Sequence, residues 1–184
     1  MTERLSKALS SVGDALVGVD ADAVALACQR IASAGRVGLY GCGREGFQVR
    51  GFAMRLYHLG ITAGYVGETT MPPLGTGDVL VVSSGPGGLA TVDAHIATAH
   101  GAGASVVLVT AQPDLVKPAA DDLVLTIPAQ TMASDGDAGE DDILPMGSVY
   151  EAALFFLFEW MVADLKAITG EPAKAVRARH TNME

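Results

Sequence analysis

Two clusters of glycine and small polar residues are the parts of this sequence best suited to holding a ligand. Each cluster follows a short apolar run typical of a β-strand and precedes a segment with a helical pattern. Such turns bring backbone N–H groups close to a ligand at a helix N-terminus, where the helix dipole favours negative charge. We therefore expect one shared crevice at a sheet edge, formed by Gly41, Gly43, Arg44, Glu45, Ser83, Ser84, Gly85, Gly87 and Gly88.

The first cluster, residues 41–46, also has the GxGxxG spacing of a dinucleotide-binding turn. Glu68 lies about where an acid that binds the ribose of such a cofactor belongs. The strand that precedes a dinucleotide-binding turn is usually the first element of its domain, however, whereas here a helical segment over residues 2–34 comes first. No second mononucleotide-binding half is evident either. We therefore favour a different small ligand and keep the dinucleotide as an alternative.

Apolar runs and helical patterns alternate along the 184 residues, which predicts one α/β domain with a five-stranded, doubly wound parallel sheet. The predicted parts are a helical arm (2–34), a sheet core (36–128), a polar loop (133–142) and a last long helix with its tail (146–184). The expected strands are residues 36–40, 62–66, 79–83, 105–109 and 123–127. The expected helices after the arm are residues 45–59, 88–102 and 146–168, with a short turn at 115–119.

Composition excludes several classes of partner. The formal net charge of −9 argues against nucleic acid, because phosphate backbones require clustered lysine and arginine. Although 49% of the residues are hydrophobic, no apolar stretch reaches the roughly 20 residues of a membrane span. The first residues lack the apolar stretch of a secretory signal, so we expect a cytoplasmic protein. Cys28 and Cys42 do not have metal-ligand spacing, and we expect no metal site.

Five segments, in their order along the chain, resemble the sugar isomerase (SIS) domain family and specifically its 6-phospho-3-hexuloisomerases. They are residues 41–46, 52–60, 66–69, 145–151 and 179–184, so the resemblance covers most of the chain. It implies interconversion of a 3-keto hexose 6-phosphate and fructose 6-phosphate, without a metal or organic cofactor. It also implies a homo-dimer or homo-tetramer, which agrees with the strongly apolar last helix.

The resemblance also implies roles for single residues. Glu151 matches the family's proposed base, which would move a proton through an enediol. His180 in the tail would assist ring opening or proton transfer, in its own or in a neighbouring subunit. His58 and Arg55 lie on the first crossover helix and would reach an active site at a subunit boundary.

Three residues depart from the family pattern in the glycine turns. Glu45 stands where the family usually has serine, and Pro86 and Leu89 replace two hydroxyl residues. Because such hydroxyls and amides hold the phosphate in SIS domains, we expect weaker phosphate binding here. Glu45 is expected either to face solvent and pair with Arg44 or Arg50, or to face the crevice and bind a hydroxyl or amine. We favour the second arrangement.

Three functions stay open. The leading hypothesis is a sugar-phosphate isomerase with Glu151 as its base. The second is a protein that binds a sugar or polyol without turning it over, and the third is an isomerase of a different substrate. The presence of Glu151 and of the tail residues favours a catalytic function. Glu45, Pro86 and Leu89 argue against binding of a substrate phosphate in the manner usual for the family.

Overall fold

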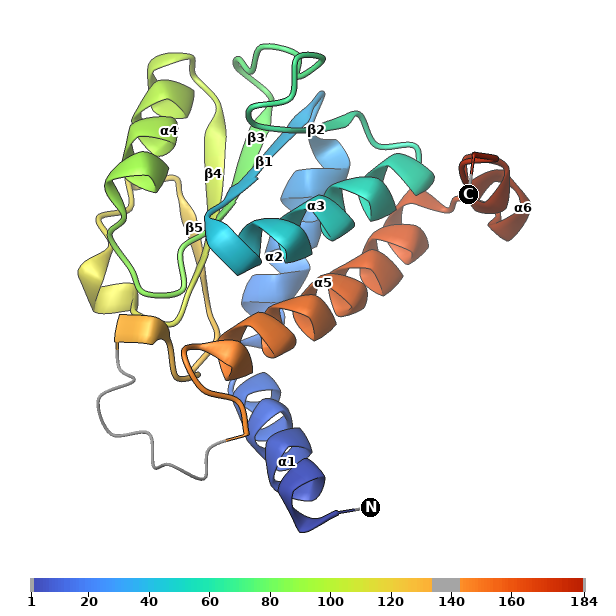
Figure 1. Ribbon diagram of the computed structural model, residues 1–184. Coiled ribbons are helices and arrows are strands. Elements are labelled where there is room, and N and C mark those ends of the chain that lie inside the picture. The colour runs from blue at the N-terminus through green and yellow to red at the C-terminus, as the bar shows by residue number, and fades with distance from the viewer. Residues whose placement is uncertain (1, 134–142, 184) are drawn as a thin grey trace.

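The predicted α/β fold is confirmed. The computed structural model describes residues 2–133 and 143–183, and its strands form one parallel sheet in the order β2–β1–β3–β4–β5 (Figure 1). Each strand lies within one residue of its predicted bounds. The predicted polar loop, residues 133–142, lies outside the described residues except for Ala133. The strands are β1 (Val37–Gly41), β2 (Ala63–Tyr65), β3 (Val79–Ser83), β4 (Ser105–Thr110) and β5 (Leu123–Thr126).

The helical arm consists of two helices, α1 and α2. Asp20 starts the second helix, because its carboxylate accepts hydrogen bonds from the backbone N–H groups of Asp22 and Ala23. The turn expected at 115–119 lies earlier, as a short 3₁₀ helix, η1 (Pro113–Leu115). In the described part of the chain, no helix is both long and apolar enough to cross a membrane. The helices are α1 (Glu3–Val17), α2 (Ala21–Ser33), α3 (Gly43–His58), α4 (Ala90–Gly101), α5 (Ser148–Thr169) and α6 (Ala173–Ala178).

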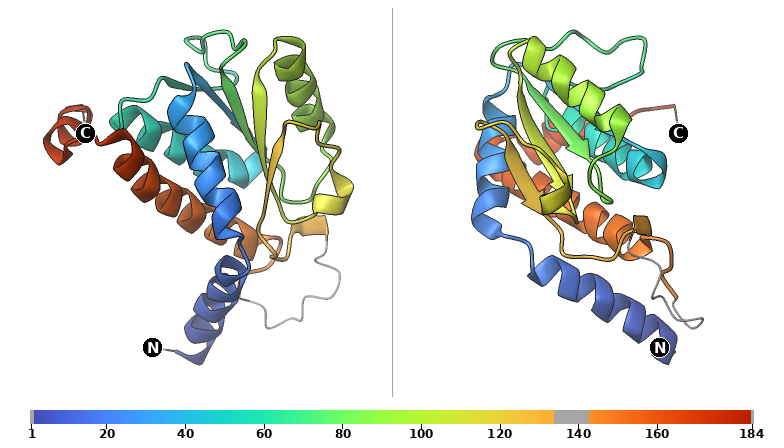
Figure 2. Two further views of the ribbon diagram at one scale, coloured as in Figure 1. Left: turned by 180° about the vertical axis from the view of Figure 1, so that it is seen from behind. Right: turned by 90° about the vertical axis from the view of Figure 1, so that its left-hand side faces the viewer.

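Helices cover both faces of the sheet, as the two views in Figure 2 show. Alternate strand residues such as Val81 and Val109 pack against α2, α3 and α5, whereas Val82 and Leu108 pack against α4 on the other face. Because both faces are buried, the central strands are continuous apolar runs rather than alternating ones. Helix α1 packs against α5 and projects from the rest of the domain.

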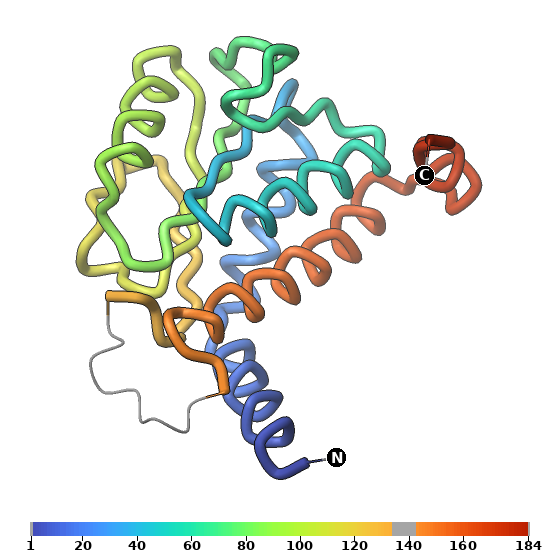
Figure 3. The backbone as a smooth tube through the Cα atoms, in the orientation of Figure 1, coloured from blue at the N-terminus to red at the C-terminus, as the bar shows by residue number. Residues whose placement is uncertain are grey.

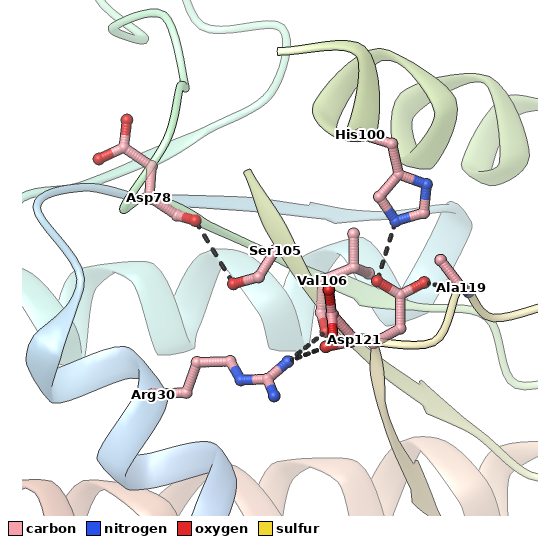
Figure 4. A network of polar contacts seen from close by, with 8 residues as sticks. Arg30, Asp78, His100, Ser105, Val106, Ala119 and Asp121 are labelled. Carbon is pink, nitrogen blue, oxygen red and sulfur yellow. Dashed lines mark hydrogen bonds and ion pairs between the residues drawn. The ribbon is translucent and has the colours of Figure 1, made fainter. Parts of the chain in front are cut away.

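Polar contacts secure the amino edge of the sheet (Figure 4). Arg30 of α2 donates from Nη1 to the backbone oxygen of Asp121, just before β5, at 2.6 Å. His100 near the end of α4 lies with Nε2 2.9 Å from a carboxylate oxygen of Asp122. These contacts hold helices from both faces to the start of one strand. The glycine turns lie at the opposite, carboxyl edge.

Two glycines allow α3 to begin directly against the end of β1. A Cβ atom on Gly46 would lie 2.6 Å from the backbone oxygen of Gly41, which is too close for any other residue type. The same oxygen accepts a hydrogen bond of 2.7 Å from the Tyr65 hydroxyl. The GxGxxG spacing therefore supports close packing of a strand and a helix in this protein.

Gly46→Ala should lower the free energy of unfolding by about 1–3 kcal/mol, because its Cβ would meet backbone atoms of Gly41. Gly51→Ala is the matched control on the same helix, where a Cβ would meet nothing within 4 Å. It should be neutral or raise the free energy of unfolding by up to about 1 kcal/mol. Urea denaturation measures both, and equal stabilities of the two variants would contradict the packing role of Gly46.

Candidate active site

A cavity of about 370 Å³ lies at the carboxyl edge of the sheet, and its size suits a small ligand. The first glycine turn forms one wall with Gly43, Arg44 and Glu45. The turn between β3 and α4 contributes Pro86 and Leu89, and the start of α5 contributes further residues described below. The structure thus joins segments that are more than a hundred residues apart in the sequence.

The approach to α5 has an unusual backbone. Met146 has a φ of 57° and Gly147 a φ of 81°, so two successive residues adopt left-handed conformations. Such conformations are costly for a side chain such as that of Met146 and occur often at functional sites. The helix begins immediately afterwards, and Glu151 lies in its first turn.

An ion pair connects the starts of α3 and α5. Arg44 Nε lies 3.0 Å from Oε2 of Glu151. The same guanidinium donates to Ser148 Oγ at 3.0 Å and to the backbone oxygen of Met146 at 2.6 Å. Arg44 therefore holds the Glu151 carboxylate at the cavity wall and does not pair with Glu45.

The surroundings of Glu151 favour its action as a base. Burial raises the pKa of Glu151 above its usual value, the charge of Glu45 raises it further, and Arg44 opposes the increase. The side chain is only 17% exposed. A carboxylate with a raised pKa binds a proton more readily, which is what removal of a proton from a carbon acid requires.

Glu45 faces inward, as in the favoured of the two expected arrangements, and does not face solvent. The residue is 8% exposed. Ser83 Oγ donates to Oε2 at 2.5 Å, and the backbone N–H of Gly85 lies 3.1 Å from both carboxylate oxygens. Burial raises the pKa of Glu45, and the hydrogen bonds from Ser83 and Gly85 oppose that increase.

Tyr150 was not among the predicted site residues, although it precedes Glu151 in the sequence and lines the cavity. It is fully buried, and its hydroxyl lies 3.1 Å from Ser83 Oγ. Burial and the nearby charge of Glu45 raise the pKa of Tyr150 well above its usual value, so it stays a neutral phenol. The sequence signal was weak, since a tyrosine on an apolar helix is commonly a core residue.

The structure places three predicted substrate-binding residues of the second turn away from this cavity. Ser84 Oγ donates to the backbone oxygen of Gly87 inside the turn, and both residues line a separate cavity of about 540 Å³ beside α4. Gly87 has a φ of +89°, and a Cβ on it would lie 2.7 Å from that of Leu115. A Cβ on Gly88 would likewise lie 3.1 Å from the Leu115 backbone oxygen. These residues shape the turn, as Gly41 does at the end of β1.

Arg55, His58 and His180 also lie away from the cavity within one chain. His58 comes thirteen positions after Glu45 along the helix, which corresponds to about 20 Å. His58 instead stacks on His180 with 5.3 Å between ring centroids, and both line another cavity of about 530 Å³. Arg55 binds Glu159 of α5 through two hydrogen bonds. Figure 3 shows the C-terminal segment beside the end of α3, far from the start of α5.

The residues present suit acid–base chemistry on a small polar ligand. Among residues 2–133 and 143–183, no group of three or more histidine, cysteine or acidic side chains is arranged to hold a metal ion. A doubly wound parallel sheet, with a carboxylate and glycine turns at its carboxyl edge, agrees with the class that the five sequence segments resemble, the sugar isomerase (SIS) domains.

Comparisons with known proteins identify the family within this class. A 3-hexulose-6-phosphate isomerase of Mycobacterium gastri is 35% identical over 184 residues, covering 100% of this chain and 92% of the relative. One of Bacillus subtilis is 26% identical over 183 residues, covering 100% and 98%. A solved Methanococcus jannaschii protein, for which this isomerase function has been inferred, superposes with a TM-score of 0.80 at 23% identity over 96% of this chain and 98% of its own. No family model matches the chain.

The chain belongs to the 3-hexulose-6-phosphate isomerase family, also called the 6-phospho-3-hexuloisomerases. The resemblance carried by the five sequence segments is therefore confirmed, and the dinucleotide alternative is set aside. The first glycine turn serves strand–helix packing and positions Arg44 and Glu45.

Stability should depend on pH through Glu45. Since the folded-state pKa is raised above the ordinary value of 4.5, there is a pH range between the two pKa values in which the native protein keeps a proton that the unfolded chain has released, and above that range Glu45 is an anion in both states. The stabilising contribution is complete below about pH 4.5 and is lost as pH rises through the raised folded-state pKa. Glu45→Gln removes this dependence, so the stability of the variant relative to the wild type should increase from about pH 4.5 to pH 8.

Urea denaturation at several pH values measures this difference. Glu3→Gln, at a side chain that is 83% exposed, controls for the loss of one negative charge. The measured quantity is the free energy of unfolding of Glu45→Gln minus that of the wild type. If this difference stays constant or falls as pH rises, the assigned effect of burial is contradicted.

Proposed function

We propose that this protein is a sugar-phosphate isomerase that moves a carbonyl group between neighbouring carbons of a hexulose 6-phosphate. One observation carries the proposal: Glu151, a largely buried carboxylate, is held by Arg44 at the wall of the cavity. The names of the Mycobacterium gastri and Bacillus subtilis relatives support the substrate class. We also propose a cytoplasmic location, and this part of the proposal rests on the sequence pattern alone.

The reaction needs one base that accepts a proton and returns it. Starting from fructose 6-phosphate, Glu151 takes the proton from carbon 3, and the electrons of the C–H bond form the double bond of the enediol. The ketone oxygen on carbon 2 takes up a proton in the same step. Glu151 then returns its proton to carbon 2 while the hydroxyl on carbon 3 loses its proton, which leaves the ketone on carbon 3. The oxidation of one carbon balances the reduction of the other.

Arg44 acts as a positioning residue in this scheme. Its guanidinium fixes the Glu151 carboxylate through Nε, and its two Nη atoms are held by Ser148 and Met146. The same positive charge opposes the increase in the pKa of Glu151 and so favours the ionised form that accepts a proton. A carboxylate fixed in this way loses little rotamer freedom when the substrate binds.

The protein should catalyse exchange of the carbon-3 proton of fructose 6-phosphate with solvent. In heavy water, NMR should show deuterium at that carbon. Glu151→Gln should slow the exchange by about 100-fold or more, because the amide cannot accept the proton. Asp164→Asn, a change on the same helix but outside every cavity described above, should leave the rate unchanged. Absence of exchange with folded wild-type protein would contradict the proposed function.

We further propose that the protein forms a homo-oligomer through the outer face of α3 and α5. Side chains on this face expose large apolar surface, and Met54 and Phe155 lie together at the rim of a small cavity between the two helices. Exposed apolar surface gathered on two adjacent helices is typical of an interface. The exposed residues are Phe47, Met54, Tyr57, Phe155 and Phe156.

The same face supports a shared active site. His58 and His180 lie at the end of α3, next to Met54 and Tyr57 and about 20 Å from Glu45 of their own chain. A second copy seated on this face would come close to the exposed His180, whose ring stacks on the buried His58. We propose that His180, with His58 beside it, assists proton transfer in the site of the neighbouring subunit.

Subunit mixing tests the shared site. Glu151→Gln and His180→Ala should each lower activity strongly, and co-refolding them together should restore about a quarter of the wild-type activity in a two-fold dimer. Half of the dimers are then mixed, and each mixed dimer has one site with both wild-type residues. No recovery, with mixed dimers demonstrated by mass spectrometry, would contradict a contribution of His180 across the interface.

A further inference from the structure

The turn between β3 and α4 already holds an anion, and that anion is the Glu45 side chain. Its carboxylate accepts a hydrogen bond of 2.5 Å from Ser83 Oγ and lies 3.1 Å from the Gly85 N–H through both oxygens. With 8% exposure, Glu45 is a buried part of the structure rather than a surface charge. The turn therefore has the geometry to bind an anion, and an internal carboxylate occupies its donors.

The close fit of this arrangement depends on the absence of a side chain at Gly85. A Cβ atom there would lie 3.0 Å from Oε1 of Glu45 and 2.8 Å from the ring of Tyr150. Ser83 has a single hydroxyl proton, which goes to Glu45, so the Tyr150 hydroxyl donates to Ser83 Oγ at 3.1 Å. The Ser83 hydroxyl and the Gly85 N–H, which lie directly behind Glu45, are thus both committed to the carboxylate.

The guanidinium of the preceding residue, Arg44, does not pair with Glu45. Arg44 directs its Nε to Glu151 and its two Nη atoms to Ser148 Oγ and the Met146 backbone oxygen. A dianionic phosphate that approached Ser83 and Gly85 would meet a buried negative charge instead of free donors. The two residues of the turn that line the cavity add no side-chain donor, because the side chains of Pro86 and Leu89 are apolar, and Pro86 also lacks a backbone N–H group.

We infer that Glu45 is a specificity-determining residue, an internal anion that competes with the phosphate of a substrate for the turn between β3 and α4. The inference deepens the proposed function and depends on it for the identity of the substrate. A sugar whose distal end is a hydroxyl can donate to the Glu45 carboxylate, whereas a phosphorylated sugar must displace that carboxylate. This protein therefore discriminates less strongly in favour of phosphorylated sugars than a chain with serine at position 45 would.

Binding of inorganic phosphate tests the inference without any assay of activity. Glu45→Ser removes the carboxylate and supplies a hydroxyl, so its affinity for phosphate, measured by calorimetry, should be about tenfold or more above that of the wild type. Glu45→Gln keeps the size of the side chain and removes the charge, and it should also bind phosphate more tightly than the wild type. Glu3→Ser, on the exposed face of α1, controls for the change in net charge.

Kinetics then connect the residue to the substrate. Proton exchange is measured with fructose 6-phosphate and with fructose. The kcat/KM for fructose 6-phosphate is divided by that for fructose, and this ratio is compared between wild type and Glu45→Ser. The ratio should rise about tenfold or more in the variant. Phosphate affinity that is unchanged or weaker in both folded Glu45 variants would overturn the inference.

The two proposals fail in different ways. If no protein exchanges protons on either sugar but the Glu45 variants still bind phosphate more tightly, the role of Glu45 stands and the isomerase function is wrong. If exchange occurs and depends on Glu151 while the Glu45 variants leave both phosphate affinity and the ratio unchanged, the isomerase function stands and the role of Glu45 is wrong.

Discussion

The parallel register of β1 against β3 determines where the candidate site residues lie. It places Gly41 opposite Ser83, so the two strands end side by side and their following turns come within hydrogen-bonding distance. Glu45 in the first turn of α3 can then reach Ser83 and Gly85. A shift of β3 by one residue would turn Ser83 to the opposite face of the sheet and break this contact. The site is thus a consequence of strand pairing in the core.

The contact between Arg44 and Glu151 matters for position rather than for stability. The Arg44 side chain is 48% exposed, and pairs exposed to this extent contribute about 0–1 kcal/mol to folding. Its value lies in fixing the carboxylate at the start of α5, a helix whose inner face belongs to the core. The long helix supplies rigidity, and the ion pair supplies orientation. Together they present one carboxylate to the cavity in a defined direction.

Most of the fold could be predicted because its signals are local. Apolar runs and glycine turns mark the strands, and Asp20 marks a helix start through contacts only two and three residues away. The site was predicted less completely, because its contacts join distant segments. The pairing of Arg44 with Glu151 and the place of Tyr150 in the polar cluster both depend on packing between elements. Periodicity along the chain contains no information about such pairings.

The position of Glu45 on a rigid helix also bears on how such proteins diverge. Its backbone is fixed by the close contact of Gly41 and Gly46, so replacing the side chain alters what fills the neighbouring turn without altering the course of the chain. After gene duplication, a change at one codon could then redirect a copy toward new ligands while its overall architecture stayed the same. Likeness of architecture among relatives therefore says more about their descent than about the chemical group each has come to recognise.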